Sequence, residues 1–524
     1  MQDTPETAPS LASQPAPRLA DAQKYVVRTL GCKANLYDSQ LIEAELQKRG
    51  WRPALDPNSP DVGLYIVNSC TVTDEADRQS RKMAARLGRD NPDARVVITG
   101  CSAEVDPERL ASSRGIDYVI GNRDKPKLVE IVLEKIKKAA ELKAAEGAAG
   151  TTGATDALTG VRRGEVLGVA QGYREMTSRH PIDREWPATE SAFSGSLDES
   201  SSSHRTRAFL KIQDGCNAFC TYCVIPYGRG PSRSISIPDV ISQVKNLASQ
   251  GVREVVITGI NIGDYGTDWS EGMQVEQLFE TILGETELPR LRVSSLDPSE
   301  ITPGLMKLVE KDSRFCPHFH VSLQSPHPRI LRLMKRKYSE KEVRECLTKI
   351  SELAAPAGGV FVGMDLITGF PGETDEEFEW TVKALEELPW SRLHVFPYSE
   401  RSGTPATRLP GSVPPQVRAA RAEKLRALSL ERLKSVYRKA WATLQESGRP
   451  LTSVLMEGSV RGPDGSRDWV SGYSLNYLRV MVKAPGASTS AGSGLENQIL
   501  EDLVPYEIIV DSDGGDVAFL ARRS

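Results

Sequence analysis

Three cysteines stand close together in the segment DGCNAFCTYC: Cys216, Cys220 and Cys223. Thiolates at this spacing on one loop can bind one soft metal centre, such as an iron–sulfur cluster, zinc or copper(I). A structural zinc site needs a fourth Cys or His, and no His lies between His204 and His318. The spacing therefore favours a [4Fe–4S] cluster with one iron left open for a substrate. A chance grouping, or zinc with an unidentified ligand, is the alternative.

A second set of cysteines is spread along the chain. Cys32, Cys70 and Cys101 each come directly after a predicted strand, in TLGCKAN, IVNSCTVT and VITGCSAE. The carboxyl ends of neighbouring parallel strands meet at one edge of a sheet, so the three side chains are expected to converge there. They predict a second three-cysteine cluster, again with an open iron. Cys316 and Cys346 have no such placement and are interpreted as structural.

The elements that position these cysteines alternate between apolar runs and helical periods, which indicates an α/β protein. Residues 24–138 predict a small parallel α/β domain, with strands at 24–30, 62–70, 94–101 and 117–122. Residues 139–206 are rich in Ala, Gly, Ser and Thr and predict a linker or insertion that is partly disordered.

The βα alternation returns after residue 207. Six predicted strands, at 208–213, 253–259, 290–296, 318–323, 359–369 and 392–399, fit a partial (β/α)6 barrel with its chemistry at the carboxyl ends of the strands. An open doubly wound sheet is the competing topology.

An amphipathic helix is predicted at 415–446, in which eight Lys and Arg face three Glu. It trails the central part, which spans 207–440. Short strands separated by Gly, Asp and Ser turns then predict a small β-barrel at 441–524.

Composition narrows the class of protein. The 524 residues are 39% hydrophobic and carry a formal net charge of −4, which is typical of a globular protein with several domains. No apolar run is long enough to span a bilayer, and the N-terminal segment lacks the pattern of a signal peptide. We therefore expect a cytoplasmic protein with no membrane partner. Eight cysteines are too few for a disulfide scaffold.

Several long motifs, in order, resemble those of the radical SAM methylthiotransferases. The resemblance covers residues 24–524 and rests on TLGCKANLYDSQ, NSCTVTDEADRQSRK, TGCSAEVDPERL, RAFLKIQDGCNAFCTYCVIPYGRGPSRS, VSSLDPSEI, MDLITGFPGETDEEF and HVFPYSERSGTPATRL. The family has an N-terminal cluster-binding domain, a radical SAM partial barrel and a C-terminal TRAM barrel that binds RNA. It implies a similar division here, with a TRAM-like barrel at 441–524.

The resemblance implies two [4Fe–4S] clusters and S-adenosylmethionine as cofactors. The cluster at Cys216, Cys220 and Cys223 would cleave S-adenosylmethionine to a 5′-deoxyadenosyl radical. The cluster at Cys32, Cys70 and Cys101 would supply the sulfur, methylated by a second S-adenosylmethionine. A low-potential electron donor of the flavodoxin or ferredoxin type is the expected reductant, and we expect a monomer.

Polar residues and glycines at predicted strand ends are candidates for binding S-adenosylmethionine. They are Asn261, Ser295, Asp297, Gln324, Gly369 and Gly372. One departure concerns the segment LQSPHP at 323–328, where relatives commonly read LQSG. Pro326 removes a backbone N–H and fixes φ, so the role of that loop does not carry over directly.

The expected substrate is tRNA, because of the TRAM-like barrel and the basic helix at 415–446, whose cations would contact phosphates. The motifs look most like the type (MtaB) that methylthiolates N6-threonylcarbamoyladenosine at tRNA position 37. Chains that act on isopentenyladenosine (MiaB type) usually read YGCQMN at the first cysteine. Those that act on an aspartate of a ribosomal protein (RimO type) usually read LGCxKN. Both types remain alternatives.

Overall fold

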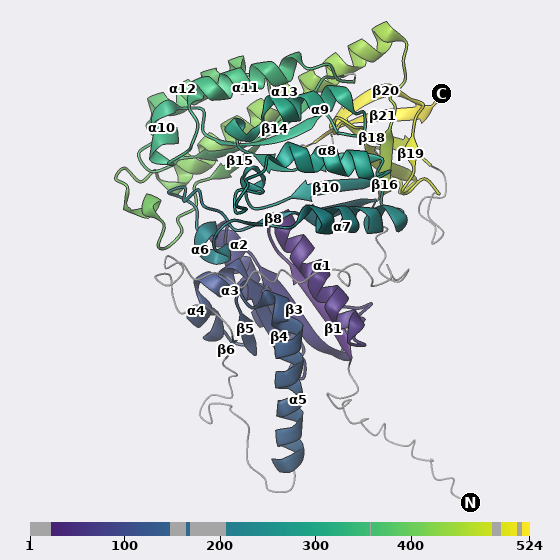
Figure 1. Ribbon diagram of the computed structural model, residues 1–524. Coiled ribbons are helices and arrows are strands. Elements are labelled where there is room, and N and C mark those ends of the chain that lie inside the picture. Colours follow the sequence, from purple (N-terminus) through teal and green to yellow (C-terminus); the bar gives the residue numbers. More distant parts are fainter. Residues whose placement is uncertain (1–22, 147–163, 168–205, 357, 485–493, 511–515) are drawn as a thin grey trace, which may run out of the picture.

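The computed structural model describes residues 23–146, 164–167, 206–356, 358–484, 494–510 and 516–524. They form an N-terminal α/β domain, a central barrel of strands and helices, and a C-terminal sheet beside the barrel (Figure 1). None of the described helices is both long and apolar enough to cross a membrane.

The N-terminal domain is a parallel sheet with the strand order β2-β1-β3-β4-β5-β6. All eight residues of β3 are buried, since helices cover both faces of the sheet and each face has its own apolar core. The elements are β1 (Lys24–Thr29), α1 (Lys33–Lys48), β2 (Arg52–Pro53), β3 (Val62–Ser69), α2 (Asp74–Asp90), β4 (Arg95–Gly100), α3 (Cys101–Val105), α4 (Pro107–Ala111), β5 (Tyr118–Ile120), η1 (Lys125–Lys127), α5 (Leu128–Glu146) and β6 (Glu165–Leu167).

Two of these elements reach into the stretch that the sequence predicts as a linker. Helix α5 continues to Glu146, and β6 adds a parallel strand beside β5. The remainder of the predicted linker, residues 147–163 and 168–205, lies outside the described residues.

The central part is a partial barrel. Its parallel strands follow their order in the chain, β7-β10-β11 and then β12-β13-β14-β15, with Ser294 separating β11 from β12. In a doubly wound sheet the order of the strands reverses at a switch point. The strands here keep their order in the chain, which indicates a partial barrel. The strands are β7 (Arg207–Lys211), β10 (Glu254–Thr258), β11 (Arg290–Val293), β12 (Ser295–Leu296), β13 (His318–Gln324), β14 (Phe361–Thr368) and β15 (Arg392–Pro397).

Helices cover the outside of this barrel and contribute to the largest apolar core of the protein. They are α6 (Ile225–Arg229), α7 (Ile237–Ser249), α8 (Val275–Glu285), α9 (Pro303–Lys311), α10 (Pro328–Leu333), α11 (Glu340–Glu352) and α12 (Asp375–Glu387). The short elements β8 (Gln213–Asp214), β9 (Arg233–Ser234), η3 (Ile262–Asp264), η4 (Pro298–Glu300) and η5 (Pro405–Arg408) lie in the loops.

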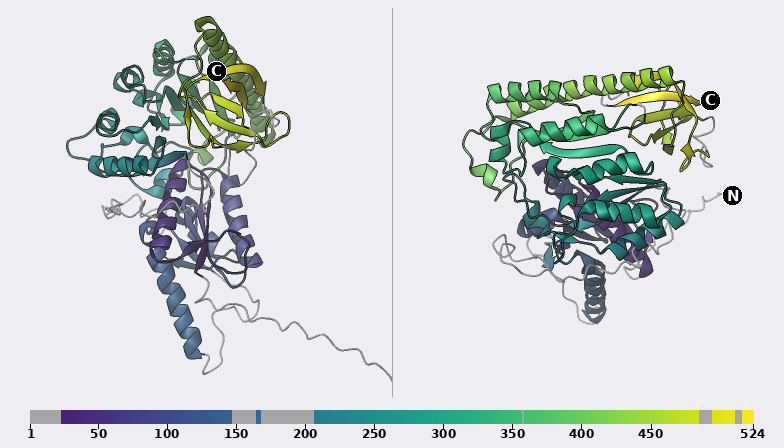
Figure 2. Two further views of the ribbon diagram at one scale, coloured as in Figure 1. Left: turned by 90° about the vertical axis from the view of Figure 1, so that its right-hand side faces the viewer. Right: turned by 45° about the horizontal axis from the view of Figure 1, so that its top comes forward.

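Helix α13 (Pro415–Ser447) runs from the barrel to the C-terminal sheet (Figure 2). Most of its cations contact protein groups: Arg418, Arg421, Lys424, Arg426, Arg432 and Lys434 each bond to a carbonyl or carboxylate of the chain. The expectation that the whole basic face meets phosphates is therefore wrong for buried Arg418 and Arg421, whereas Arg438 and Lys439 are exposed.

The C-terminal sheet is mixed and curled into a half-barrel, in the order β19-β16-β17-β18-β21-β20. The pair β18–β21 is parallel and the other pairs are antiparallel. The apolar segments at 452–458, 475–484, 506–512 and 517–523 predict β16, β18, β20 and β21, whereas no such segment predicts β17 or β19. The strands are β16 (Val454–Val460), β17 (Trp469–Tyr473), β18 (Arg479–Lys483), β19 (Ile499–Leu500), β20 (Leu503–Val510) and β21 (Val517–Arg523).

Helix α1 docks the N-terminal domain on the barrel. Tyr37 is fully buried and belongs to the apolar core of the barrel, although it comes from the other domain. Its hydroxyl donates a hydrogen bond to Gln243 Oε1 of α7 at 2.9 Å. The carboxyl edge of the N-terminal sheet, where the strands end, therefore faces the barrel.

Candidate functional site

The loop between β8 and α6 carries Cys216, Cys220 and Cys223. Burial, together with the neighbouring thiolates, raises the pKa of Cys223 to about 12, and burial raises the pKa of Cys216 to about 11. Phe219 inside the loop has a φ of 49°, an uncommon left-handed conformation for a residue other than glycine. The three sulfurs are thus neighbours on a tightly turned loop.

Arg336 follows α10 and lies beside this loop. Its guanidinium donates to Cys220 Sγ at 3.0 Å, and it forms an ion pair with Asp297. Burial opposes the charge of Arg336, but the nearby Tyr222, Tyr338 and Asp297 outweigh it and raise the already high pKa of this guanidinium, so the group is cationic at any accessible pH. Arg336 could not be identified from the sequence, because no local motif connects it to a cysteine more than 100 residues away.

The second triad lies where the sequence predicts it, after the adjacent strands β1, β3 and β4. Cys32 precedes the first turn of α1, and Cys101 begins α3. Burial and the nearby Cys101 and Cys32 raise the pKa of Cys70 to about 12. Gly31 has a φ of 94°, and a Cβ there would lie 2.5 Å from Cys70 Sγ.

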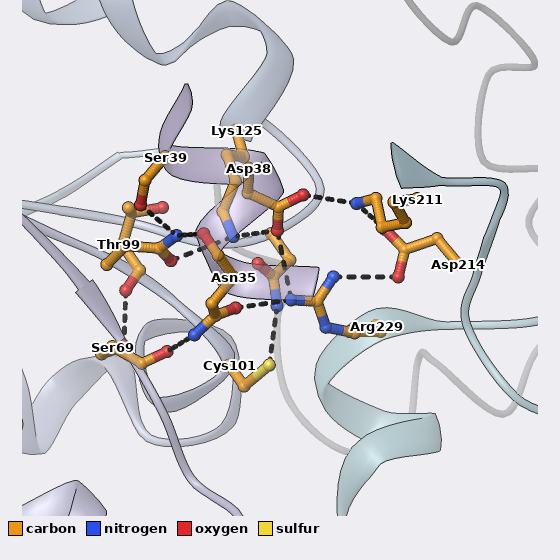
Figure 3. A network of polar contacts seen from close by, with 12 residues as sticks. Asn35, Asp38, Ser39, Ser69, Thr99, Cys101, Lys125, Lys211, Asp214 and Arg229 are labelled. Carbon is orange, nitrogen blue, oxygen red and sulfur yellow. Dashed lines mark hydrogen bonds and ion pairs between the residues drawn. The ribbon is translucent and has the colours of Figure 1, made fainter. Parts of the chain in front are cut away.

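A buried network of charges joins this triad to the barrel (Figure 3). Asp38 of α1 accepts from Lys125 at 3.0 Å, from Arg229 at 3.1 Å and from Lys211. Asp214, two residues before Cys216, accepts from Lys211 and Arg229, each at 2.9 Å. Burial opposes ionisation of Asp38, but the three cations outweigh it and lower the pKa of that carboxyl.

Arg233 also lies 3.7 Å from Asp214, so the network has four cations and two carboxylates and its excess charge is positive. Arg229 interacts electrostatically with Cys101 and Cys32. Asn122 donates to Cys101 Sγ at 3.4 Å and to the carbonyl of Gly228, beside Arg229, at 2.7 Å. Buried positive charge next to three thiols suits ligands that bind as thiolates.

Each triad has the donor set of an iron–sulfur cluster. All eight cysteines are free thiols. Within the described parts of the chain, no three His, Cys, Asp or Glu side chains converge on a point that could hold one metal ion. A four-iron cluster binds each thiolate at a separate corner and does not require the three sulfurs to meet at one point. Of the other cysteines, Cys346 packs in the barrel core and Cys316 is fully buried.

The candidates for binding S-adenosylmethionine all lie at the carboxyl end of the barrel, and several already have protein partners. Asp297 pairs with Arg336, and the N–H of Asn261 donates to Gln213 Oε1 at 2.9 Å. The N–H of Gly369 donates to Glu373, and that of Gly372 to the carbonyl of Gly411, both at 2.7 Å. These last two residues therefore shape a turn, and their contact with adenine stays a prediction.

Gln324 and Ser295 complete this set. In the LQSPHP segment it is Gln324, with a φ of 63°, that takes the left-handed conformation, two residues before Pro326. The side chains of Gln324 and Ser295 are partly exposed at the ends of β13 and β12.

Two family models match the chain. Residues 24–121 match the uncharacterized protein family UPF0004, and residues 210–385 match the radical SAM superfamily. A threonylcarbamoyladenosine tRNA methylthiotransferase of Bacillus subtilis is 33% identical, over 91% of this chain and 94% of its own length. The corresponding protein of Aquifex aeolicus is 34% identical, over 83% and 93%.

The chain belongs to the radical SAM methylthiotransferase family. It is an enzyme, and membership implies a [4Fe–4S] cluster and S-adenosylmethionine as cofactors. A tRNA-2-methylthio-N(6)-dimethylallyladenosine synthase of Ehrlichia canis is 27% identical, over 77% of this chain and 83% of its own length. Among solved structures, the radical S-adenosylmethionine methyltransferase TsrM of Kitasatospora setae matches with a TM-score of 0.47 and 17% identity, covering 71% of this chain and 72% of that one.

Proposed function

We propose that this methylthiotransferase modifies N6-threonylcarbamoyladenosine at position 37 of tRNA, giving the 2-methylthio derivative. The observation that carries the proposal is the similarity, over most of both chains, to two enzymes named for this nucleoside. The residues of the two triads support it, because the reaction needs both a radical generator and a sulfur donor.

In this proposal the two triads hold different clusters. The cluster at Cys216, Cys220 and Cys223 supplies reductive cleavage of S-adenosylmethionine to a radical, and that at Cys32, Cys70 and Cys101 supplies sulfur. Arg336 donates to the Cys220 sulfur and stabilises negative charge there. Arg229 interacts electrostatically with Cys101 and Cys32 of the second triad, and its hydrogen bond to Asn35 links that domain to the barrel.

The carboxyl end of the barrel would hold S-adenosylmethionine. Asn261, Ser295, Asp297 and Gln324 are the polar side chains we assign to its amino acid and ribose parts, with Gly369 and Gly372 near the adenine. The ion pair with Arg336 fixes the Asp297 carboxylate beside the cysteine loop, where the amino acid part would bind.

The C-terminal half-barrel is assigned to tRNA, in the manner of a TRAM domain. Exposed cations can contact phosphates in the second half of α13, in the loop between β16 and β17 and near the end of β21: Arg438, Lys439, Arg461, Arg467, Arg522 and Arg523. A flavodoxin- or ferredoxin-type protein would provide electrons, and the reaction would take place in the cytoplasm.

Nucleoside analysis tests the proposal. Digested tRNA from a strain that lacks the gene should lose 2-methylthio-N6-threonylcarbamoyladenosine in mass spectrometry, and the plasmid-borne gene should restore it. Loss of only the isopentenyl derivative would replace the proposal by the dimethylallyladenosine reaction. A mass change on a ribosomal protein, with tRNA unaltered, would point to the aspartate-modifying type.

A further inference from the structure

Polar side chains of β13, β14 and β15 line the interior of the barrel. Along β13, Phe319, Val321 and Leu323 are fully buried against the helices, whereas the alternating His320, Ser322 and Gln324 are partly exposed. Asp365 of β14 and His394 of β15 are partly exposed in the same way. Since side chains alternate across a strand, these residues face a lumen that is accessible to solvent.

Two histidines and an aspartate from three adjacent strands meet in this lumen. His320 Nε2 lies 2.9 Å from Asp365 Oδ2, and the rings of His320 and His394 stack with centroids 5.1 Å apart. Gly363 lies beside both rings: a Cβ there would be 3.4 Å from His320 Nδ1 and 3.8 Å from His394 Nε2. The absence of a side chain at Gly363 leaves both ring edges open to a ligand.

Lys33 reaches the same lumen from the other domain. It is the first residue of α1, directly after Cys32. Its ammonium interacts electrostatically with Arg292, Arg207, Asp365 and Glu254 of the barrel, and it also acts on His318 and His394. Burial and the two arginines lower the pKa of Lys33. These partners come from six different strands, so the Lys33 side chain points into the barrel.

The charge of Lys33 lacks a direct counterion. Among the described residues, its ammonium makes no hydrogen bond or ion pair, while the carboxylates near it have other partners. Asp365 pairs with His320, and Glu254 pairs with Arg290 and Arg292. A partly buried cation that is left without an anion is costly, so the lumen is electrostatically suited to an anionic group of a ligand.

We propose that Lys33 binds the carboxylate of an amino acid group on the substrate nucleoside, with His320 and His394 bonding to its polar atoms. This inference rests on the proposed function, whose substrate bears a threonyl carboxylate on N6. In adenine, N1 is flanked by C2 and by C6, which carries N6, so a group on N6 can lie near C2 on the same edge of the ring. Binding that group at Lys33 would therefore bring C2 close to Cys32 and the sulfur donor.

The test measures binding of anticodon stem-loops to the anaerobic holoenzyme by fluorescence anisotropy. Three stem-loops are compared: one with threonylcarbamoyladenosine, one with the neutral methylamide of its carboxylate, and one with unmodified adenosine. Wild-type enzyme should bind the carboxylate form about tenfold more tightly than the methylamide, as expected for one charge-assisted hydrogen bond. Lys33→Gln should lose that preference while binding the methylamide as wild type does. Lys33→Arg should keep the preference.

Matched controls separate this effect from damage to the fold. Lys48→Gln removes an exposed lysine from the other end of α1 and should bind all stem-loops as wild type does. Iron content and the visible spectrum of each variant report whether the clusters persist. An equal preference for the carboxylate in Lys33→Gln and wild type would overturn the inference, as would equal loss of affinity for all three stem-loops.

Failure of the proposed function would look different. In that case wild-type enzyme would neither methylthiolate the threonylcarbamoyl stem-loop nor bind it better than the unmodified one. If wild-type enzyme methylthiolates it but does not distinguish the carboxylate from the methylamide, the function stands and only the role of Lys33 is wrong.

Discussion

Arg229 and Asn35 face each other across the boundary between the barrel and the N-terminal domain. The Arg229 guanidinium donates to Asn35 Oδ1 at 2.6 Å, and Asn35 in turn donates to the carbonyl of Ser69, next to Cys70, at 2.9 Å. Asn35 thus connects the Arg229 guanidinium to the end of β3, which Cys70 directly follows. The position of the second triad relative to the barrel depends on this buried contact.

Replacing Arg229 by Gln should therefore destabilise the protein. The change leaves Asp38 and Asp214 buried with one cation fewer, and breaking a buried ion pair from one side typically costs about 3–5 kcal/mol. Urea denaturation under anaerobic conditions measures the free energy of unfolding. Arg86→Gln, which removes an exposed pair with Asp90, is the control and should change it by less than about 1 kcal/mol. Equal effects of the two changes would contradict the importance of the network.

Gly31→Ala should disrupt the second triad. The new Cβ would lie 2.5 Å from Cys70 Sγ, in a backbone conformation with a φ of 94° that disfavours alanine. We expect the purified protein to lose about half of its iron, as measured by a colorimetric assay. Gly251→Ala provides the matched control, because Gly251 has a similar φ of 85° with nothing within 4 Å. It should cost about 1–2 kcal/mol of stability and no iron.

Arg336→Gln should lower the reduction potential of the cluster at the Cys216 loop. A guanidinium on the Cys220 sulfur favours the more negative, reduced state. A decrease of roughly 60 mV corresponds to about 1.4 kcal/mol for one electron. Redox titration followed by electron paramagnetic resonance, in a Cys70→Ala background, isolates this cluster. Exposed Arg332→Gln serves as the reference, and an unchanged potential in Arg336→Gln would refute the assigned role.

The eight cysteines should divide into three classes. Cys220→Ala should abolish cleavage of S-adenosylmethionine, whereas Cys70→Ala should leave cleavage largely intact and stop sulfur insertion. Cys346→Ala, in the barrel core, should retain both activities. Cleavage is followed by chromatography of 5′-deoxyadenosine and insertion by mass spectrometry of the nucleoside. If Cys346→Ala lost either activity, the division would be wrong.

Glu300→Gln should stabilise the protein at alkaline pH. Burial and the nearby Asp297 carboxylate raise the pKa of Glu300 to about 7. The folded state therefore binds more protons than the unfolded state between the ordinary glutamate pKa and 7, so stability falls as pH rises through this range. The variant should be more stable than wild type at pH 8, on the order of 1–3 kcal/mol, and similar at pH 5. Thermal unfolding at both pH values measures this, with exposed Glu352→Gln as the reference.

The N-terminal sheet was predictable because its strands are buried on both faces and read as continuous apolar runs, as in Val62–Ser69. That pattern also implied that Cys32, Cys70 and Cys101 follow adjacent strands. Strand β17 was missed, since WVSGY is short and contains a glycine. The half-open form of the C-terminal sheet likewise depends on pairings that no local pattern specifies.

Contacts between distant segments were beyond sequence reasoning. Arg229 and Asn35 are 194 positions apart, and their contact exists only after two domains dock. The alternation of HFHVSLQ in β13 is visible in the sequence, but a strand alone does not reveal which of its faces lines a lumen. The partners of Lys33 depend on the same docking.

Residues in the first two turns of helix α1 interact with different parts of the protein. Lys33 faces the lumen, Asn35 and Asp38 join the charge network, and Tyr37 enters the barrel core. Each residue turns the helix by about 100°, so one inserted or deleted residue after Cys32 would redirect all four side chains at once. The segment should therefore tolerate substitutions on its free side but no change in length, and alignments of functional homologues should contain no gap between Cys32 and Asp38.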